Sequence, residues 1–270
     1  MSALIADKTF DLIYAKEYIL SIQVSLDGFY FSIIHNNRLL ALKKSPVKIS
    51  SGKFLGRRFS EWLSTNKIFE KNFKEVRIIY FSDKITAIPG DYYNYDKQDE
   101  LINRLFGKQS GYKAYDNYWP ANRCNLVFSI NEQFLKEAAQ KFSNFKIIHP
   151  VTVLNDRIQS QLKENTIFIT LYFYKNSFFT ILYSGKELKS VNCYNYTNSD
   201  DAAFYLFSLL SANNIVYKEA NLIVAGDIET YNNICGKLSS HTGTISFVKP
   251  EVSFNIHTFP EPMYRFITIV

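Results

Sequence analysis

The sequence predicts an α/β protein built from two similar halves, for three reasons. Two segments each contain three short runs of alternating apolar and polar residues separated by turn residues, a pattern typical of a three-stranded meander. A helical pattern and then a buried-strand pattern follow both segments in the same order. Aromatic residues form 16% of the chain, and they favour sheet-rich structure.

The spacing between the two segments is steady, which indicates an internal duplication. The residue types at matched positions differ, so chance agreement is the alternative. At offsets of 147, 148 and 144 residues, the matched positions are Leu20 with Ile167, Asn37 with Gly185, and Ile78 with Leu222.

The first half begins with its meander. Asp-Gly and Asn-Asn pairs tolerate the positive φ angles of tight hairpins, so we place turns at Asp27-Gly28 and Asn36-Asn37. Aromatic and leucine side chains then share one face of a helix over Lys53–Asn66. The continuous apolar run in Lys74–Ser82 predicts a buried strand. The three strands expected in the meander are Tyr18–Ser25, Phe29–His35 and Arg38–Lys44.

The second half repeats this order. Its meander occupies Thr166–Tyr196, with turns at Lys175-Asn176 and Ser184-Gly185. A helix over Asp200–Ala212 follows, and its first turn is acidic, as the helix dipole favours. The expected N-cap is Asn198 or Ser199, and the expected buried strand is Ala220–Ala225.

We divide the chain into a first half, residues 1–163, and a second half, residues 164–270. The first half carries an insertion at about residues 83–121 that has no counterpart in the second. Because Tyr and Trp dominate binding hot spots, this insertion could be a binding loop. The alternative, which we favour, is a small subdomain whose rings pack on the body. Its aromatic residues include Tyr92, Tyr93, Tyr95, Tyr112, Tyr115, Tyr118 and Trp119.

After the insertion the regular order resumes and leads into the second half. The apolar tail, Phe254–Val270, is expected to cover the second sheet or to serve as an interface strand. The expected elements before the second half are a strand Asn125–Ile130, a helix Asn131–Phe142, a strand Phe145–His149 and a helix Val151–Leu162.

Composition narrows the class of protein. No apolar run reaches about 18 residues, so we expect no transmembrane segment. The N-terminal stretch carries Asp7, Asp11 and Glu17 and lacks the apolar core of a signal peptide. The 3 cysteines have no paired or metal-ligand spacing, which favours free thiols in a cytoplasmic protein.

The net charge of +6 divides into +8 over the first half and −2 over the second. A basic half could attract nucleic acid, but we do not favour this because lysines also simply solvate a surface.

Motifs for other chemistry fail. The stretch Cys235–Ser239 approaches a P-loop, but Leu238 follows its lysine and no glycine lies five residues earlier. The 4 histidines are far from one another and from the cysteines in sequence. We therefore predict neither a metal site nor a His–Cys nucleophilic pair.

Several stretches resemble a known superfamily. The segments ILSIQVSLDGFYFSI, IIYFSDKITAIPGDYY and FPEPMYRFITIV are similar to an uncharacterised bacterial family with the actin-like ATPase (RNase H-like) fold. The region NLVFSINEQFLKEAAQKFSNFKIIHPVTVLNDRI also resembles the matching part of pilus-assembly and type II secretion proteins of this superfamily. The resemblance implies that each half holds a five-stranded mixed sheet with flanking helices, and that nucleotide, where it binds, sits between the halves.

The phosphate motifs of that superfamily are altered in this chain. Active members carry an Asp-x-Gly turn in each meander and a later Gly-Gly, which cradle phosphate, position Mg²⁺ and admit adenosine. These motifs fall here on Gln23-Val24-Ser25, on Thr170-Leu171-Tyr172 and on Gly226-Asp227. A tyrosine ring at the second site would fill the phosphate space, and an acid at the third would repel an anion. The resemblance therefore implies the fold without ATP hydrolysis.

The leading hypothesis is a non-catalytic scaffold that binds a protein partner or itself, with no cofactor, catalytic residue or metal. The alternative is a nucleotide-binding protein or weak ATPase that holds ATP and Mg²⁺ in an altered cleft between the halves. The residues expected to line that cleft are Ser25, Asp27, Lys175, Asn176, Gly226 and Asp227.

Overall fold

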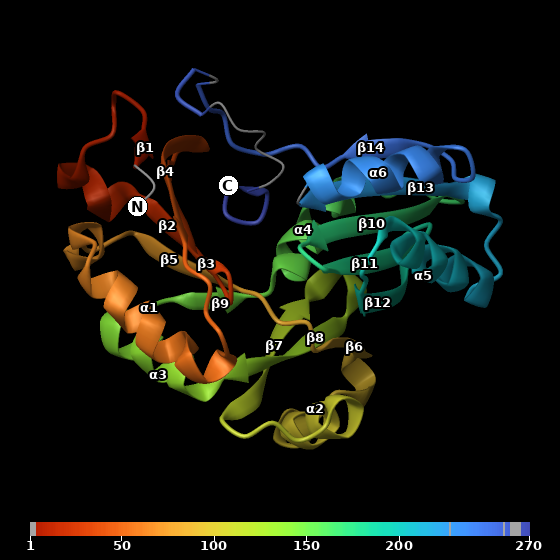
Figure 1. Ribbon diagram of the computed structural model, residues 1–270, viewed down its shortest axis with the longest axis horizontal. Coiled ribbons are helices and arrows are strands. Elements are labelled where there is room, and N and C mark those ends of the chain that lie inside the picture. Colours follow the sequence, from red (N-terminus) through yellow and green to blue (C-terminus); the bar gives the residue numbers. More distant parts are fainter. Residues whose placement is uncertain (1–3, 227, 256, 260–265) are drawn as a thin grey trace.

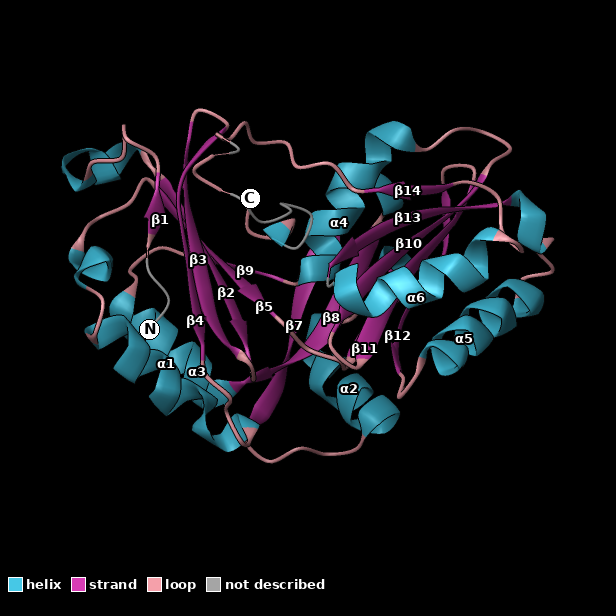
Figure 2. Ribbon diagram, turned by 45° about the horizontal axis from the view of Figure 1, so that its top comes forward, coloured by secondary structure: helices cyan, strands magenta, loops and turns pink. Residues whose placement is uncertain are grey.

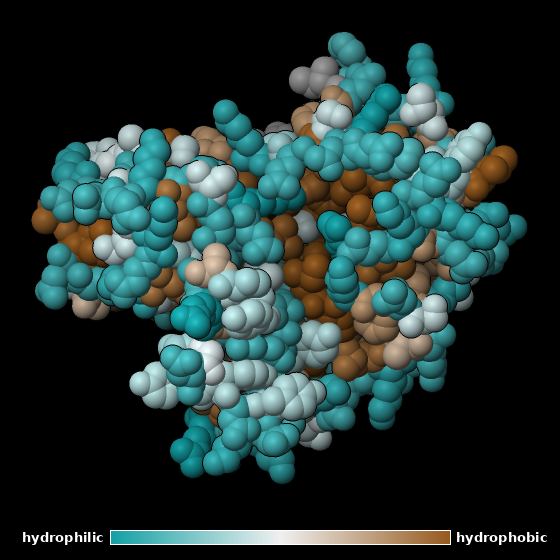
Figure 3. All heavy atoms as spheres, turned by 180° about the vertical axis from the view of Figure 1, so that it is seen from behind, coloured by the Kyte–Doolittle hydropathy of each residue, from teal (hydrophilic) through white to brown (hydrophobic). Residues whose placement is uncertain are grey.

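Three β-sheets carry the fold of the computed structural model, which describes residues 4–226, 228–255, 257–259 and 266–270. A six-stranded sheet forms the first half, a five-stranded sheet forms the second, and a three-stranded sheet lies between and below them (Figure 1). Within the described part of the chain, no helix is long and apolar enough to cross a membrane. From behind, the molecule shows a hollow with a hydrophobic floor and a hydrophilic rim (Figure 3).

The first sheet has the strand order β1-β4-β3-β2-β5-β9. The predicted meander is confirmed: β2, β3 and β4 are antiparallel neighbours, and β5 and β9 then add parallel strands beyond β2. Asn36 and Asn37 have φ angles of 48° and 58°, as their turn requires. The first turn is centred one residue earlier than expected, on Leu26-Asp27, because Ser25 pairs with Gly28. The strands are β1 Ile5–Ala6, β2 Ile19–Ser25, β3 Gly28–His35, β4 Arg38–Pro46, β5 Glu75–Tyr80 and β9 Lys146–Ile148.

The second sheet repeats this arrangement with the order β12-β11-β10-β13-β14. Its antiparallel meander and two parallel strands match β4-β3-β2-β5-β9 of the first sheet one for one. The duplicated halves are thus confirmed, and the two-residue strand β1 is the only extra strand of the first sheet among the described residues. The strands are β10 Ile167–Tyr174, β11 Ser177–Ser184, β12 Glu187–Asn195, β13 Ala220–Gly226 and β14 Ile245–Phe247.

Helices flank both sheets (Figure 2). On the first sheet α1 packs against α3, where the rings of Phe59 and Phe134 lie 4.9 Å apart. On the second sheet α5 packs against α6, and the Asn198 side chain caps α5 by accepting from the backbone N–H groups of Asp200 and Asp201. In both views α4 lies between the halves. The helices are α1 Leu55–Ser64, α2 Gln98–Phe106, α3 Glu132–Lys141, α4 Pro150–Ile158, α5 Ser199–Ala212 and α6 Ile228–Ser239.

The third sheet contains two strands from the insertion and the strand that follows the insertion. Its order is β6-β8-β7, from β6 Ile85–Pro89, β7 Tyr112–Trp119 and β8 Cys124–Asn131. The predicted strand over 125–130 exists as part of β8, but it pairs with β6 and β7 and does not return to the first sheet. The insertion boundaries at about residues 83 and 121 stay a prediction.

The described part of the tail covers the first sheet, so the expectation that it covers the second was wrong. Ser253 bridges to Arg38 at the end of β4, and Phe259, Phe266 and Ile269 pack on the first sheet in one apolar cluster. The tail packs there because one face of the first sheet has no helix among the described residues to bury it. Helices α5 and α6 already bury one face of the second sheet and α4 packs on the other, whereas α1 and α3 bury only one face of the first.

Candidate functional site between the two halves

The tips of two equivalent hairpins meet between the halves. The first tip is Ser25–Gly28, between β2 and β3, and the second is Tyr174–Ser177, between β10 and β11. The Ser25 hydroxyl and the Tyr174 hydroxyl share a hydrogen bond of 2.6 Å. The Lys175 ammonium forms an ion pair with the Asp27 carboxylate. The two tips are therefore bonded to each other.

A pocket of about 410 Å³, here called the central pocket, opens beside the hairpin tips. Its walls come from both tips, from the loop Phe81–Lys84, from residues before and within β7, and from β8. The rings of Tyr80, Tyr112 and Phe179 supply part of an apolar lining. Its polar residues include Ser25, Asp27, Asp83, Lys84, Lys175, Asn176 and Ser177.

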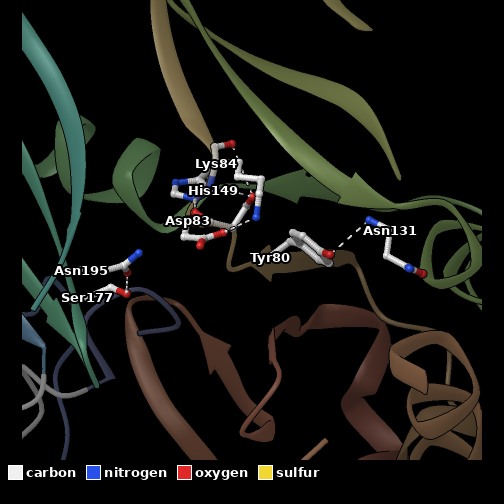
Figure 4. Close-up of polar contacts among 8 residues, drawn as sticks. Tyr80, Asp83, Lys84, Asn131, His149, Ser177 and Asn195 are labelled. Carbon is white, nitrogen blue, oxygen red and sulfur yellow. Dashed lines mark hydrogen bonds and ion pairs between the residues drawn. The ribbon is translucent and has the colours of Figure 1, made fainter. Parts of the chain in front are cut away.

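Hydrogen bonds hold the walls of the central pocket in place (Figure 4). The Tyr80 hydroxyl accepts from the backbone N–H of Asn131 at 3.1 Å, which ties β5 to the start of α3. In the second half the Ser177 hydroxyl donates to the Asn195 side chain at 2.7 Å. Lys84 lies 3.3 Å from the carboxylate of Asp83, so both signs of charge are present at the rim.

His149 fixes the loop that forms one wall. Its Nδ1 accepts from the backbone N–H of Val151 at 3.2 Å, so Nε2 carries the proton and donates to the Ser82 carbonyl at 2.9 Å. Complete burial lowers the pKa of His149 to about 3, and the ring is neutral at physiological pH. This histidine therefore joins the loop to the start of α4 and is not a general acid or base.

A second cavity of about 190 Å³, the mouth cavity, also borders the tips, since Tyr174 and Lys175 line both cavities. Gln23, Tyr172 and Gly226 line it, together with Lys44 and Phe266. Tyr172 is 1% exposed, and its ring lies 5.8 Å from that of Phe81. The tail lies beside this cavity: Thr268 donates to the Gln23 side chain at 3.3 Å, and the Lys44 ammonium lies 4.8 Å from the centre of the Phe266 ring.

Comparison with known proteins establishes the family. A family model described as "Protein of unknown function (DUF3822)" matches residues 7–245. The chain belongs to this family. No curated protein matches its sequence.

Solved structures show which fold the DUF3822 chain shares. A Bacteroides thetaiotaomicron protein, described as having an actin-like ATPase fold and unknown function, matches with a TM-score of 0.82 at 18% identity, over 96% of this chain and 99% of that one. The PilM–PilN type IV pilus biogenesis complex matches with a TM-score of 0.54 at 11% identity, over 93% and 96%. The cytoplasmic domain of EpsL, from the type II secretion system of Vibrio cholerae, matches at 0.45 and 6% identity, over 93% and 92%. The actin-like ATPase fold predicted from the sequence is thus confirmed.

At two of the altered phosphate motifs, the described residues Thr170 and Gly226 serve packing in this DUF3822 protein. Thr170 is 1% exposed, and among the described residues its hydroxyl has no hydrogen-bond partner. Gly226 has a φ of 95°, and a Cβ there would lie 2.0 Å from the Phe173 carbonyl oxygen. Close approach of β10 therefore requires this glycine, whether or not a ligand binds. Asp227 lies outside the described residues.

The structure brings together most of the residues predicted for the cleft. Ser25, Asp27, Lys175 and Asn176 line the central pocket, whereas Gly226 lines the mouth cavity with Lys175. Sequence reasoning missed Tyr174 and the tail. Tyr174 immediately precedes the predicted turn, so its position was a usable signal, but no local pattern places the tail at the mouth.

The aromatic insertion divides into inward and outward residues. Tyr93 packs beneath α2, Trp119 is 1% exposed and Tyr115 packs on the main core, as the subdomain hypothesis predicts. Tyr92 and Tyr95 are 84% and 68% exposed, and Tyr118 is exposed as well. The buried rings agree with the subdomain hypothesis, and the binding-loop hypothesis stays a prediction.

The thiols of Cys124 and Cys193 are not activated. Burial raises the pKa of Cys124 to about 11 and that of Cys193 to about 12, so both stay protonated at neutral pH. Among the described residues, no three His, Cys, Asp or Glu side chains are grouped as a metal site would need.

Proposed function

We propose that this protein is a non-catalytic scaffold with an actin-like fold that works by binding a protein partner. The observation that supports this best is the contact between the two hairpin tips. In an active member of the superfamily the two tips would hold phosphate between them. Here Ser25 bonds to Tyr174, and Asp27 pairs with Lys175, so each tip has the other as its partner.

The size of the mouth cavity also supports the proposal. Its volume of about 190 Å³ lies below the range of roughly 300–1,000 Å³ that small-molecule sites usually occupy. Tyr172 and Phe266 are two of the side chains that line it, so bulky rings form part of its wall.

A structural neighbour guides the choice of partner. The PilM–PilN structure is a complex of two proteins, so this fold can serve assembly. The proposal includes a reducing, cytoplasmic setting, which the free thiols of Cys124 and Cys193 support.

Two measurements on the purified protein test the proposal. We expect no phosphate release from ATP with Mg²⁺ above the buffer blank, and no rise in melting temperature at millimolar ATP. Hydrolysis that stops in a Gln23→Ala or Thr170→Ala variant, with the variant still folded by circular dichroism, would falsify it.

The second candidate is a nucleotide-binding protein or weak ATPase that uses the central pocket. That pocket has about 410 Å³, enough for a small molecule, and four of the predicted cleft residues line it. Under this proposal ATP and Mg²⁺ would bind near Asp27 and Lys175. At a hundred times its dissociation constant, a nucleotide should add about 2.7 kcal/mol of stability. A thermal shift that disappears in a Lys175→Ala variant would favour this candidate over the first.

A further inference from the structure

We propose that a groove between β6 and β12 binds an extended, acidic peptide segment of a partner protein. The inference rests on the proposed protein-binding function and names the chemistry of the partner. The groove, here called the edge groove, has a volume of about 530 Å³ and is lined by residues of β6, of the turn before β8, and of β12 with its preceding turn.

Both strands beside the groove are sheet edges. Within the described residues, β6 pairs only with β8, and β12 pairs only with β11. The two strands lie beside each other, yet no backbone hydrogen bond joins these two fully described strands. Edge strands carry unpaired backbone N–H and C=O groups, and an extended peptide can satisfy them.

The lining of the groove suits a peptide better than a nucleic acid. Ala87, Leu188 and Val191 supply apolar surface for alternate side chains of a strand. No aromatic residue is among the described residues that line the groove, so bases have no ring to stack on.

The charge of the groove selects an acidic segment. Three cations line it, Arg123, Lys186 and Lys189, against the single acid Glu187. The Glu187 carboxylate lies 2.6 Å from Lys189 and is already paired. Lys186 lies 3.5 Å from Glu164, outside the groove lining.

Arg123 is the residue that would anchor a carboxylate. It is exposed, and in the described part of the chain no carboxylate lies within ion-pair distance of its guanidinium. Its backbone has a φ of 48°, and its carbonyl accepts from the N–H of Gly90 at 2.7 Å, which fixes the position of the turn. A guanidinium on a fixed turn suits two-pronged binding of a carboxylate.

The test uses fluorescence anisotropy with the full chain and a labelled seven-residue peptide that alternates valine and glutamate. We expect saturable binding of this peptide, and at least tenfold weaker binding of a peptide with lysine in place of glutamate. Arg123→Asn should weaken binding of the acidic peptide at least tenfold. Asparagine tolerates the left-handed backbone at this position, so the fold should be retained.

A matched control distinguishes binding at a specific site from general electrostatic attraction between the peptide and the protein. Arg123→Glu and Lys108→Glu make the same change in net charge, and Lys108 lies in an exposed loop outside the groove. Only the first should abolish binding. Equal losses in both variants, equal binding of the lysine peptide, or no binding at 1 mM peptide would overturn the proposal. So would displacement of the peptide by single-stranded DNA that itself depends on Arg123. Nucleotide binding or ATP hydrolysis would refute the proposed function, whereas failure of these peptide experiments refutes only the groove.

Discussion

Tyr174 joins the two halves more directly than any other single residue described above. Its hydroxyl bonds to Ser25 of the first half, and its ring lies 4.2 Å from the ring of Phe81. Burial raises the pKa of Tyr174 well above its usual value, so the hydroxyl keeps its proton and can donate. A residue next to a predicted turn thus became a contact between halves.

Removing this hydroxyl should destabilise the protein measurably. We expect Tyr174→Phe to lower the free energy of unfolding by about 1 kcal/mol. The Ser25 oxygen would still accept from the Asp27 N–H at 3.2 Å, but its proton would have only a 3.4 Å contact to the Gly28 carbonyl. Urea unfolding measures the change. Tyr14→Phe, at a tyrosine that is exposed, is the control and should change nothing. Equal effects of the two variants would show that the hydrogen bond contributes nothing.

His149 should make stability depend on pH. Its pKa is about 3 in the folded protein and about 6.5 when unfolded, so between these values the unfolded chain binds more protons. Stability should therefore rise with pH across this window and fall as pH drops below 6.5, by up to about 1.4 kcal/mol per pH unit. His149→Asn should flatten the slope between pH 6.5 and 5, where carboxylates still contribute little. His257→Asn, at an exposed histidine, should keep the slope.

At the scale of elements, the local sequence pattern predicted where strands, turns and helices form. It did not always predict which neighbouring element each one packs against. Periodicity and turn residues placed β2, β3, β4 and their counterparts within a few residues, because strand and turn preferences are local. The pairing of β8 depends on contacts with β6, some forty residues earlier in the chain, which no local pattern encodes. The same holds for the tail, whose cover of the first sheet depends on which faces the helices had left open.

Gly226 shows how tightly two neighbouring elements of the second sheet fit. We expect Gly226→Ala to cost more than about 2 kcal/mol, because its φ of 95° is unfavourable for alanine and its Cβ would lie 2.0 Å from the backbone of β10. Gly111→Ala is the matched control, since Gly111 has a φ of 78° with nothing within 4 Å of a Cβ. It should cost only about 1 kcal/mol. Urea unfolding of both variants separates the clash from the backbone strain, and equal costs would argue against a clash.

At the scale of the whole molecule, the two halves share one core. A single cluster of buried side chains runs from Leu20 and Ile78 in the first half, through Leu154 of α4, to Tyr172 and Phe179 in the second. The hairpin tips and the tail add polar contacts across the same boundary. Duplication in sequence has therefore not left two independent domains.

This shared core predicts that both halves unfold in one transition, because neither half can open without exposing apolar surface of the other. The chain offers a probe for each half. Both tryptophans, Trp62 and Trp119, lie in the first half and report it by fluorescence, whereas Cys193 lies in the second half and is partly buried in the folded protein. We expect tryptophan fluorescence and mass-spectrometric labelling of the Cys193 thiol to give the same urea midpoint. Cys124 is buried and lies in the first half, as the tryptophans do. The urea midpoint of its labelling can therefore be compared with the fluorescence midpoint, which shows whether the two methods agree on the same half. A Cys193 midpoint below that of both first-half probes would mean that the second half unfolds alone, and that the contacts between the hairpin tips do not bind the halves into one unit.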